Sequence, residues 1–266
     1  MKKIALFITS LLFLTGCAQT TIEKIYDDVV PVNFYFVSDT PRGFKLFSET
    51  QNFLVKEGGS NLQIISDLVS GKVFPSDPEY VNLWGGTSSV NSVSIADSVA
   101  TVDLGSLTLN IGAEAEQRAI DQIVWTLTEF NSDINSIAFT VNSKTDESFA
   151  GHVDATMKFV RATDYEVLNP IQISLIEFDT EVASSITISG QACTFEANVI
   201  WRLSRDGVVV KKGVTTATSG CPDRGDWRIS FLDLEPGNYT IAALEYSAEG
   251  GSLFALDDKK FSVEEL

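Results

Sequence analysis

The sequence predicts two folded domains of different class, an α+β domain followed by an all-β sandwich. Residues 32–145 combine strand-like alternation with two stretches of helical periodicity. From residue 170 onward, short alternating segments recur and no helical period is visible. A chain of 266 residues is long enough for one large or two small domains with buried cores.

The first domain, residues 32–145, opens with an aromatic and β-branched run at 32–37, which predicts a strand, and a second strand follows within 44–55. Apolar residues share one helical face over 61–71 and again over 113–130, where Glu114 and Glu116 lie in the first turn and suit the helix dipole. Between these helices, residues 90–104 alternate around the turn Ala96-Asp97-Ser98 and predict a hairpin. Residues 136–141 return to strand.

Residues 146–169 show little periodicity, and we interpret them as an interdomain connector that packs against the body through Phe149, Met157 and Phe159. The second domain covers residues 170–266. Strands are expected at 171–178, 185–189, 197–203, 208–212, 227–231, 239–246 and 260–263. About seven short strands separated by turns favour a β-sandwich.

The first sixteen residues predict a secretory signal, because two lysines precede an apolar run that is too short to cross a bilayer of roughly 30 Å. Leu14, Thr15 and Gly16, followed by Cys17, resemble the bacterial lipobox. That resemblance implies that the Cys17 thiol is acylated and the signal removed before it; a short membrane anchor with an incidental cysteine is the alternative. Residues 17–31 would then be the lipidated cysteine and its polar tether.

This arrangement predicts an extracytoplasmic protein, attached by lipid to the outer face of the cell membrane or to an outer membrane where one exists. The formal net charge is -17, with 36 acidic and 19 basic residues. Such a charge repels phosphate backbones and anionic lipid. We therefore expect no nucleic acid partner and no membrane contact apart from the lipid on Cys17, whereas a basic partner is allowed.

Lipidation of Cys17 would leave two of the three cysteines, Cys193 and Cys221. Two thiols in an oxidising compartment predict a disulfide. The alternative is two reduced cysteines that never meet, because the sequence does not give the Cα spacing that a disulfide needs.

Several segments of the first domain resemble the GerMN domain of spore-germination and related envelope lipoproteins. They are VNFYFV (32–37), DLVSG (67–71), DPEYVNLW (77–84), ATVDL (100–104) and QIVWTLTEF (122–130). The second domain is similar to the immunoglobulin-like domain that often follows it in germination-type proteins. That likeness lies in ISGQA (188–192), FEANV (195–199) and the Asp206-Gly207 turn, and RATDYE (161–166) looks like the usual joint.

The resemblance implies an α/β fold like the ring-building domains of envelope machines, used for protein contacts, with no catalytic residues. It does not establish sporulation, because similar modules occur in bacteria that form no spores. Residues 177–184 lack the Pro/Gly turn that usually begins the second module.

The sequence favours a protein without catalysis, cofactor or metal. His152 is the single histidine, and no Gly-x-Ser-x-Gly motif is present, so we expect His152 to be a surface or packing residue. The acidic pairs at 27–28, 146–147 and 257–258 are expected to be solvated, with weak calcium binding as the alternative.

Tryptophans offer the remaining candidate site. Trp125 and Trp201 fit the apolar positions of a helix and a strand, so packing is expected for both. Trp84 and Trp227 follow loops and are the candidates for binding a wall polymer by stacking on its sugars, although packing is the preferred interpretation even there.

The leading hypothesis is therefore a non-catalytic, lipid-anchored scaffold or docking module for envelope proteins, related by resemblance to spore germination or the cell wall. The alternative is a module that binds peptidoglycan or another wall polysaccharide. A hydrolase that uses His152 or an acid is a third hypothesis.

Overall fold

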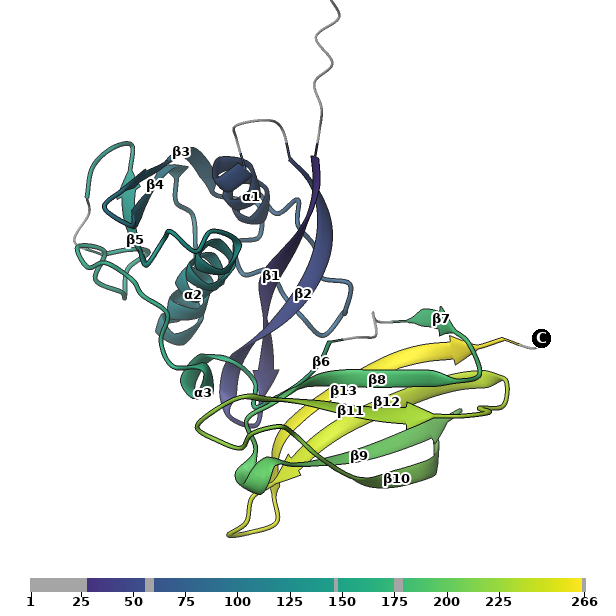
Figure 1. Ribbon diagram of the computed structural model, residues 1–266. Coiled ribbons are helices and arrows are strands. Elements are labelled where there is room, and N and C mark those ends of the chain that lie inside the picture. Colours follow the sequence, from purple (N-terminus) through teal and green to yellow (C-terminus); the bar gives the residue numbers. More distant parts are fainter. Residues whose placement is uncertain (1–27, 56–59, 146–147, 175–178, 265–266) are drawn as a thin grey trace, which may run out of the picture.

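The computed structural model describes residues 28–55, 60–145, 148–174 and 179–264. The predicted signal, the lipobox and residues 17–27 of the expected tether lie outside this part of the chain, as does the acidic pair at 146–147. Figure 1 shows an α+β domain above a β-sandwich, with a long two-stranded ribbon reaching from the first to the second. The predicted fold class is confirmed.

The first domain contains every element that its periodicity predicts. The elements are β1 (Asp28–Thr40), β2 (Gly43–Val55), α1 (Ser60–Val69), β3 (Ser89–Ala96), β4 (Val99–Ser106), α2 (Ala113–Phe130) and β5 (Ser136–Val141). β1 and β2 pair along their whole length, from Asp28 opposite Val55 to Thr40 opposite Gly43. In the second sheet, of order β3-β4-β5, β4 and β5 run parallel because α2 crosses between them.

The tether is shorter than predicted, because residues 28–31 already belong to β1. Their backbone pairs with the end of β2, and Val30 packs on the core of the first domain. Proline at position 31 does not interrupt this strand. A two-stranded ribbon leaves one side of each strand unpaired, and proline is tolerated where its missing N–H faces that side.

The second domain is a sandwich of a five-stranded sheet, in the order β10-β9-β12-β13-β7, and a three-stranded sheet, in the order β11-β8-β6. The strands are β6 (Ile171–Ile173), β7 (Thr180–Val182), β8 (Ile186–Ala192), β9 (Asn198–Arg205), β10 (Val208–Thr216), β11 (Gly225–Phe231), β12 (Gly237–Tyr246) and β13 (Leu253–Val263). The part of the expected first strand at 175–178 lies outside the described residues.

The last strand is longer than predicted. β13 begins at Leu253 rather than at 260 and carries the acidic pair at 257–258, which we expected to be solvated. This expectation is wrong for Asp257, which is 4% exposed. Besides Lys259 on the same strand, its partners Tyr80 and Ile173 lie far away in the sequence, so the sequence does not show where Asp257 is buried.

The connector packs on the first domain, but not through all three predicted residues. Phe149 is buried and Phe159 is partly buried against the core, whereas Met157 is 60% exposed. One short helix, α3 (Asp164–Val167), ends the connector beside the tip of the β1–β2 ribbon (Figure 1).

A buried charge cluster joins the two domains. The Lys259 ammonium group, on β13, donates to Asp77 of the first domain at 2.7 Å and to Asp257 at 2.9 Å, and the Lys259 side chain is 5% exposed. The Tyr80 hydroxyl lies 2.6 Å from the same ammonium and donates to Asp257 at 2.9 Å. The carboxylates of Asp257 and Asp77 outweigh the effect of burial and raise the pKa of Lys259.

A second contact clamps the tip of the ribbon to the sandwich. The Arg42 guanidinium carbon lies 4.4 Å from the ring centre of Tyr165 and 4.5 Å from that of Phe254. These cation–π contacts and the charge cluster hold the domains at two separate places, so we treat them as one body.

Replacing Lys259 with methionine should destabilise the protein by about 3–5 kcal/mol, because it leaves the buried Asp77 and Asp257 without their cation. Urea unfolding of the two chains measures the difference. Lys212→Met, at an exposed position of β10, is the matched control and should change the free energy of unfolding by no more than about 0.5 kcal/mol. Equal losses for the two variants would contradict the assigned role of Lys259.

Replacing Asp258 with asparagine should stabilise the protein above pH 7 by about 1 kcal/mol, a figure reduced for solvent screening of this half-buried group. Burial, and then repulsion by Glu79 and Asp257, raises the pKa of Asp258 to about 6. The folded protein therefore holds this proton more tightly than the unfolded chain, so wild-type stability falls as the pH rises through about 6.

Unfolding free energies measured between pH 4 and pH 8 test this effect. The gain from Asp258→Asn should shrink steeply toward pH 4, where the folded group is protonated and the unfolded group begins to be so. Asp97→Asn, in an exposed hairpin turn, should show no such trend. A gain that is independent of pH would exclude the proposed cause.

Candidate binding surfaces between the domains

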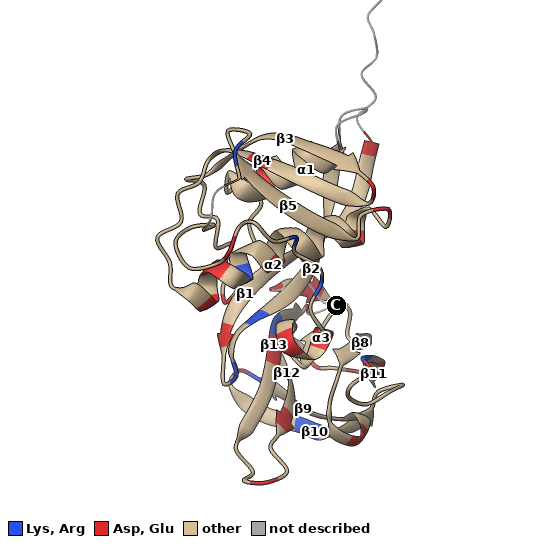
Figure 2. Ribbon diagram, turned by 90° about the vertical axis from the view of Figure 1, so that its left-hand side faces the viewer, with Lys and Arg blue, Asp and Glu red and all other residues tan. Residues whose placement is uncertain are grey.

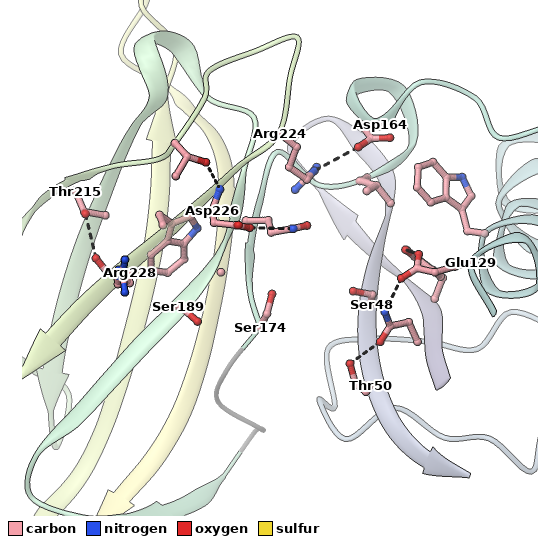
Figure 3. A pocket seen from close by; sticks show the side chains of 18 of the residues that line it. Ser48, Thr50, Glu129, Asp164, Ser174, Ser189, Thr215, Arg224, Asp226 and Arg228 are labelled. Atoms are coloured by element: carbon pink, nitrogen blue, oxygen red, sulfur yellow. Dashed lines mark hydrogen bonds and ion pairs between the residues drawn. The ribbon is translucent and has the colours of Figure 1, made fainter. Parts of the chain in front are cut away.

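The joint between the domains leaves a groove of about 880 Å³. Figure 3 shows it between the first domain, with Ser48, Thr50 and Glu129, and the sandwich, with Ser189 and Thr215. Figure 2 shows that acidic and basic residues occur along the ribbon of both domains. Hydroxyl groups and charged groups of both signs line the groove, so it suits a polar, hydrogen-bonding ligand.

On the first domain, a cationic stack forms the wall of the groove. The Arg161 guanidinium carbon lies 4.6 Å from the ring centre of Trp125, and Nε donates to the Thr128 hydroxyl at 2.7 Å. The Tyr35 hydroxyl donates to Glu129, and burial followed by the Glu129 charge raises the pKa of Tyr35. The cation–π contact and the hydrogen bonds restrain these side chains, so this wall of the groove is rigid.

Arg224 lines the groove and lies between the two domains, next to Asp164 (Figure 3). Its Nη2 donates to the Asn169 carbonyl at 2.8 Å, and its Nε lies 3.9 Å from Asp164 Oδ2. The side chain is 6% exposed, yet Nε and Nη1 have no hydrogen-bond partner among the described residues. Burial lowers the pKa of Arg224.

A smaller pocket of about 220 Å³ lies at the other side of the joint, next to a disulfide. Cys193 and Cys221, the two cysteines predicted to pair, are bonded with their Cα atoms 4.6 Å apart. Aromatic rings and one buried acid complete the pocket, which we call the aromatic pocket. Its rings are Tyr165, Phe195, Tyr246 and Phe254, and the acid is Glu245.

Trp84 and Trp227 are packing residues, in agreement with the preferred interpretation, and the structure contradicts their candidate role in binding a polymer at the surface. Trp84 is fully buried, where its indole N–H donates to the Ala119 carbonyl at 3.0 Å and its ring meets Phe149 edge-on. Trp227 lies beneath the groove but is 2% exposed. Neither ring presents a face for stacking on a sugar. Trp125 is buried, as expected for a packing residue.

His152 is a partner of the buried Glu116. Its Nδ1 lies 2.8 Å from Glu116 Oε2, and Glu116 Oε1 accepts the Ala150 and Val153 N–H groups, both at 2.9 Å. Burial acts to raise the pKa of Glu116, but these hydrogen bonds prevail and lower it. The pair fixes the 150–153 segment to the start of α2, and no hydroxyl or thiol nucleophile is bonded to His152 among the described residues.

The described ranges contain no group of three or more His, Cys, Asp or Glu residues that could hold a metal ion. In the same ranges, no helix is long and apolar enough to cross a membrane.

Sequence reasoning missed the residues that make both surfaces. Glu245 is an isolated charge in its strand, and Arg224 lies in the mixed-charge stretch Asp223-Arg224-Gly225-Asp226, which gives no sign of burial. The neighbours of both in space come from the connector and from other strands. One signal was available for Glu245, because it lies at an inward position of the alternating strand β12, between the buried Leu244 and the half-buried Tyr246.

Comparisons with known proteins agree with the two-domain division. Residues 33–147 match a family model described as sporulation and spore germination, and residues 171–252 match one described as the immunoglobulin-like domain of bacterial spore germination. A search of curated protein sequences finds no match.

Solved structures give weaker likenesses. The first GerMN domain of the sporulation protein GerM from Bacillus subtilis is 20% identical, covering 47% of this chain and 92% of that one, with a TM-score of 0.38. The tandem GerMN domains of the same protein are 14% identical, covering 77% of this chain and 62% of that one, with a TM-score of 0.42. With TM-scores this low, these alignments add nothing to the two family matches.

Replacing Cys193 and Cys221 together with serine should cost about 3.5 kcal/mol of stability, because the disulfide closes a loop with a sequence separation of 28. Denaturant unfolding under non-reducing conditions measures this loss. The same loss should appear in the wild type when a reductant is added, and the double variant should not respond to it. A wild type insensitive to reductant would contradict the bond.

Proposed function

Because the chain joins a GerMN-type domain at residues 33–147 to an immunoglobulin-like domain of the spore-germination type at residues 171–252, we propose that it is a non-catalytic envelope protein that docks other envelope proteins. In this proposal Cys17 carries the lipid that holds it on the outer face of a membrane. The role is that of a rigid, anchored contact surface.

The observation that carries the proposal is the exposed edge of the sandwich. β10 is the first strand in the order of the five-stranded sheet, so one of its sides is unpaired within that sheet. Val208, Val209, Val210 and Val214 are 45–66% exposed along it. An exposed apolar edge strand is a template for pairing with another chain. Lys211, Lys212 and the irregularity between Val209 and Lys211 shield the middle of β10, so the apolar template is the Val208–Val210 end of the strand.

Two further features support a docking role. The buried charge cluster and the Arg42 stack fix both domains in one body, so a partner that contacts both pays little entropy to order them. The lipobox-like Leu14, Thr15, Gly16 and Cys17 would confine that body to the membrane surface, which raises its effective concentration toward partners in the same envelope.

Crosslinking in cells tests the proposal. The full chain, tagged at its C-terminus, should recover a small defined set of envelope proteins, enriched about tenfold over the unanchored Cys17→Ser chain. Val208→Glu combined with Val210→Glu should abolish this recovery, because the charges disrupt pairing at the exposed edge.

The matched control is Ile95→Glu, which places the same charge at an exposed apolar residue of the first domain. This variant should recover the same proteins as the wild type. If no envelope protein is enriched, or if the edge variant behaves like the control, the docking proposal fails.

A polymer of the cell wall is the second candidate, and the groove of about 880 Å³ favours it. Its hydroxyl, amide and charged lining offers the hydrogen bonds that a glycan needs, although Trp84 and Trp227 do not take part. Under this alternative, the detergent-solubilised chain should co-sediment with purified wall. Thr50→Trp, which fills the groove, should prevent this, whereas Ser92→Trp on the exposed face of β3 should not.

A further inference from the structure

The aromatic pocket contains a buried glutamate, and only one of its two carboxylate oxygens accepts a hydrogen bond from the described residues. Glu245 is 9% exposed, and its Oε1 accepts the Phe195 backbone N–H at 2.8 Å. Its Oε2 is buried and has no hydrogen-bond partner among the described residues. An ionised carboxylate oxygen left in this state is costly, and the cost is removed when a cation is brought to it.

The rest of the pocket suits a cation that carries an apolar stem. Phe195 is 66% exposed, so its ring is available at the surface, whereas Arg42 already covers one face of Tyr165. Ring faces attract ammonium and guanidinium groups, and they also pack against the methylene chains of lysine and arginine. Arg42 already shows this preference within the chain, because it lies between the rings of Tyr165 and Phe254.

The rim of the pocket is rigid. The Cys193–Cys221 disulfide forms part of the lining, and the Cys221 N–H donates to the Thr194 carbonyl at 3.2 Å. The neighbouring Glu196 and Ala197 have φ angles of 53° and 59°, so the backbone turns sharply there and presents Phe195 outward. A preformed pocket binds a side chain with little ordering cost.

From this geometry we propose that the aromatic pocket binds a lysine or arginine side chain of a basic partner protein, with Glu245 as its counterion and Phe195 as its apolar contact. This inference deepens the docking function and rests on it. The net charge of -17 points to the same class of partner, because it attracts basic surfaces and repels a second copy of the chain. Burial raises the pKa of Glu245, and the Phe195 N–H and the charge of the nearby Arg42 offset part of this rise, so a further cation would stabilise the charged carboxylate in the same direction.

A pair of synthetic peptides tests the inference directly. Gly-Ser-Lys-Ser-Gly and the same peptide with norleucine in place of lysine have stems of similar length and differ in the ammonium group. The detergent-solubilised full chain, observed by NMR titration, should bind the lysine peptide about tenfold more tightly, because the carboxylate and the rings both favour the cation.

Glu245→Gln should remove the difference between the two peptides, since glutamine keeps the acceptor for the Phe195 N–H and loses the charge. Glu249→Gln, at an exposed glutamate of the following loop, is the control and should leave the difference intact. If Glu245→Gln does not fold, Phe195→Ala supplies the test, because this exposed side chain can be removed without opening the core and should weaken both peptides.

Equal binding of the two peptides, or binding of neither, overturns the inference. So does a preference for lysine that survives in Glu245→Gln. These outcomes leave the docking function standing, because recovery of envelope proteins through the β10 edge is measured separately. A loss of that recovery together with a retained preference for lysine would overturn the docking function and keep the pocket.

Discussion

The arrangement of the whole molecule depends on one buried ammonium group. Lys259 comes from the last strand of the sandwich, and its two carboxylate partners come from both domains. Asp257 is on the same strand as Lys259 and Asp77 is in the first domain, so separating the domains would remove one of the two carboxylates that pair with this buried charge. The groove and the aromatic pocket lie on either side of this fixed joint, and each takes residues from both domains or from their connector.

Most of the elements could be predicted because their signals are local. Period and turn residues set α2, the β3–β4 hairpin and most strands of the sandwich. The exceptions occur where contacts outside the segment decide. β13 begins seven residues early because residues 253–259 already pair with β12, and β1 begins at Asp28 because β2 is long enough to pair with it. No pattern in one segment reports a partner in another.

The candidate sites were less predictable than the fold. A loop tryptophan such as Trp84 is a reasonable surface residue until α2 supplies the Ala119 carbonyl for its indole N–H. Glu245 and Arg224 were missed for the opposite reason: each looks like an ordinary surface charge in the sequence and becomes notable only because buried atoms of its side chain lack partners among the described residues. A buried polar atom without a hydrogen-bond partner can be recognised only in the folded chain. This feature distinguishes both residues from the many solvated charged residues of the sequence.

The central claim is that the two domains form one body, and a distance measurement tests it most directly. Asp97 and Lys212 are exposed residues of different domains. Spin labels on cysteines that replace them would report the interdomain distance by pulsed electron paramagnetic resonance. The account predicts a single narrow distance distribution for the full chain, which broadens when Lys259 is replaced with methionine. A broad or multiple distribution in the otherwise wild-type chain would contradict it.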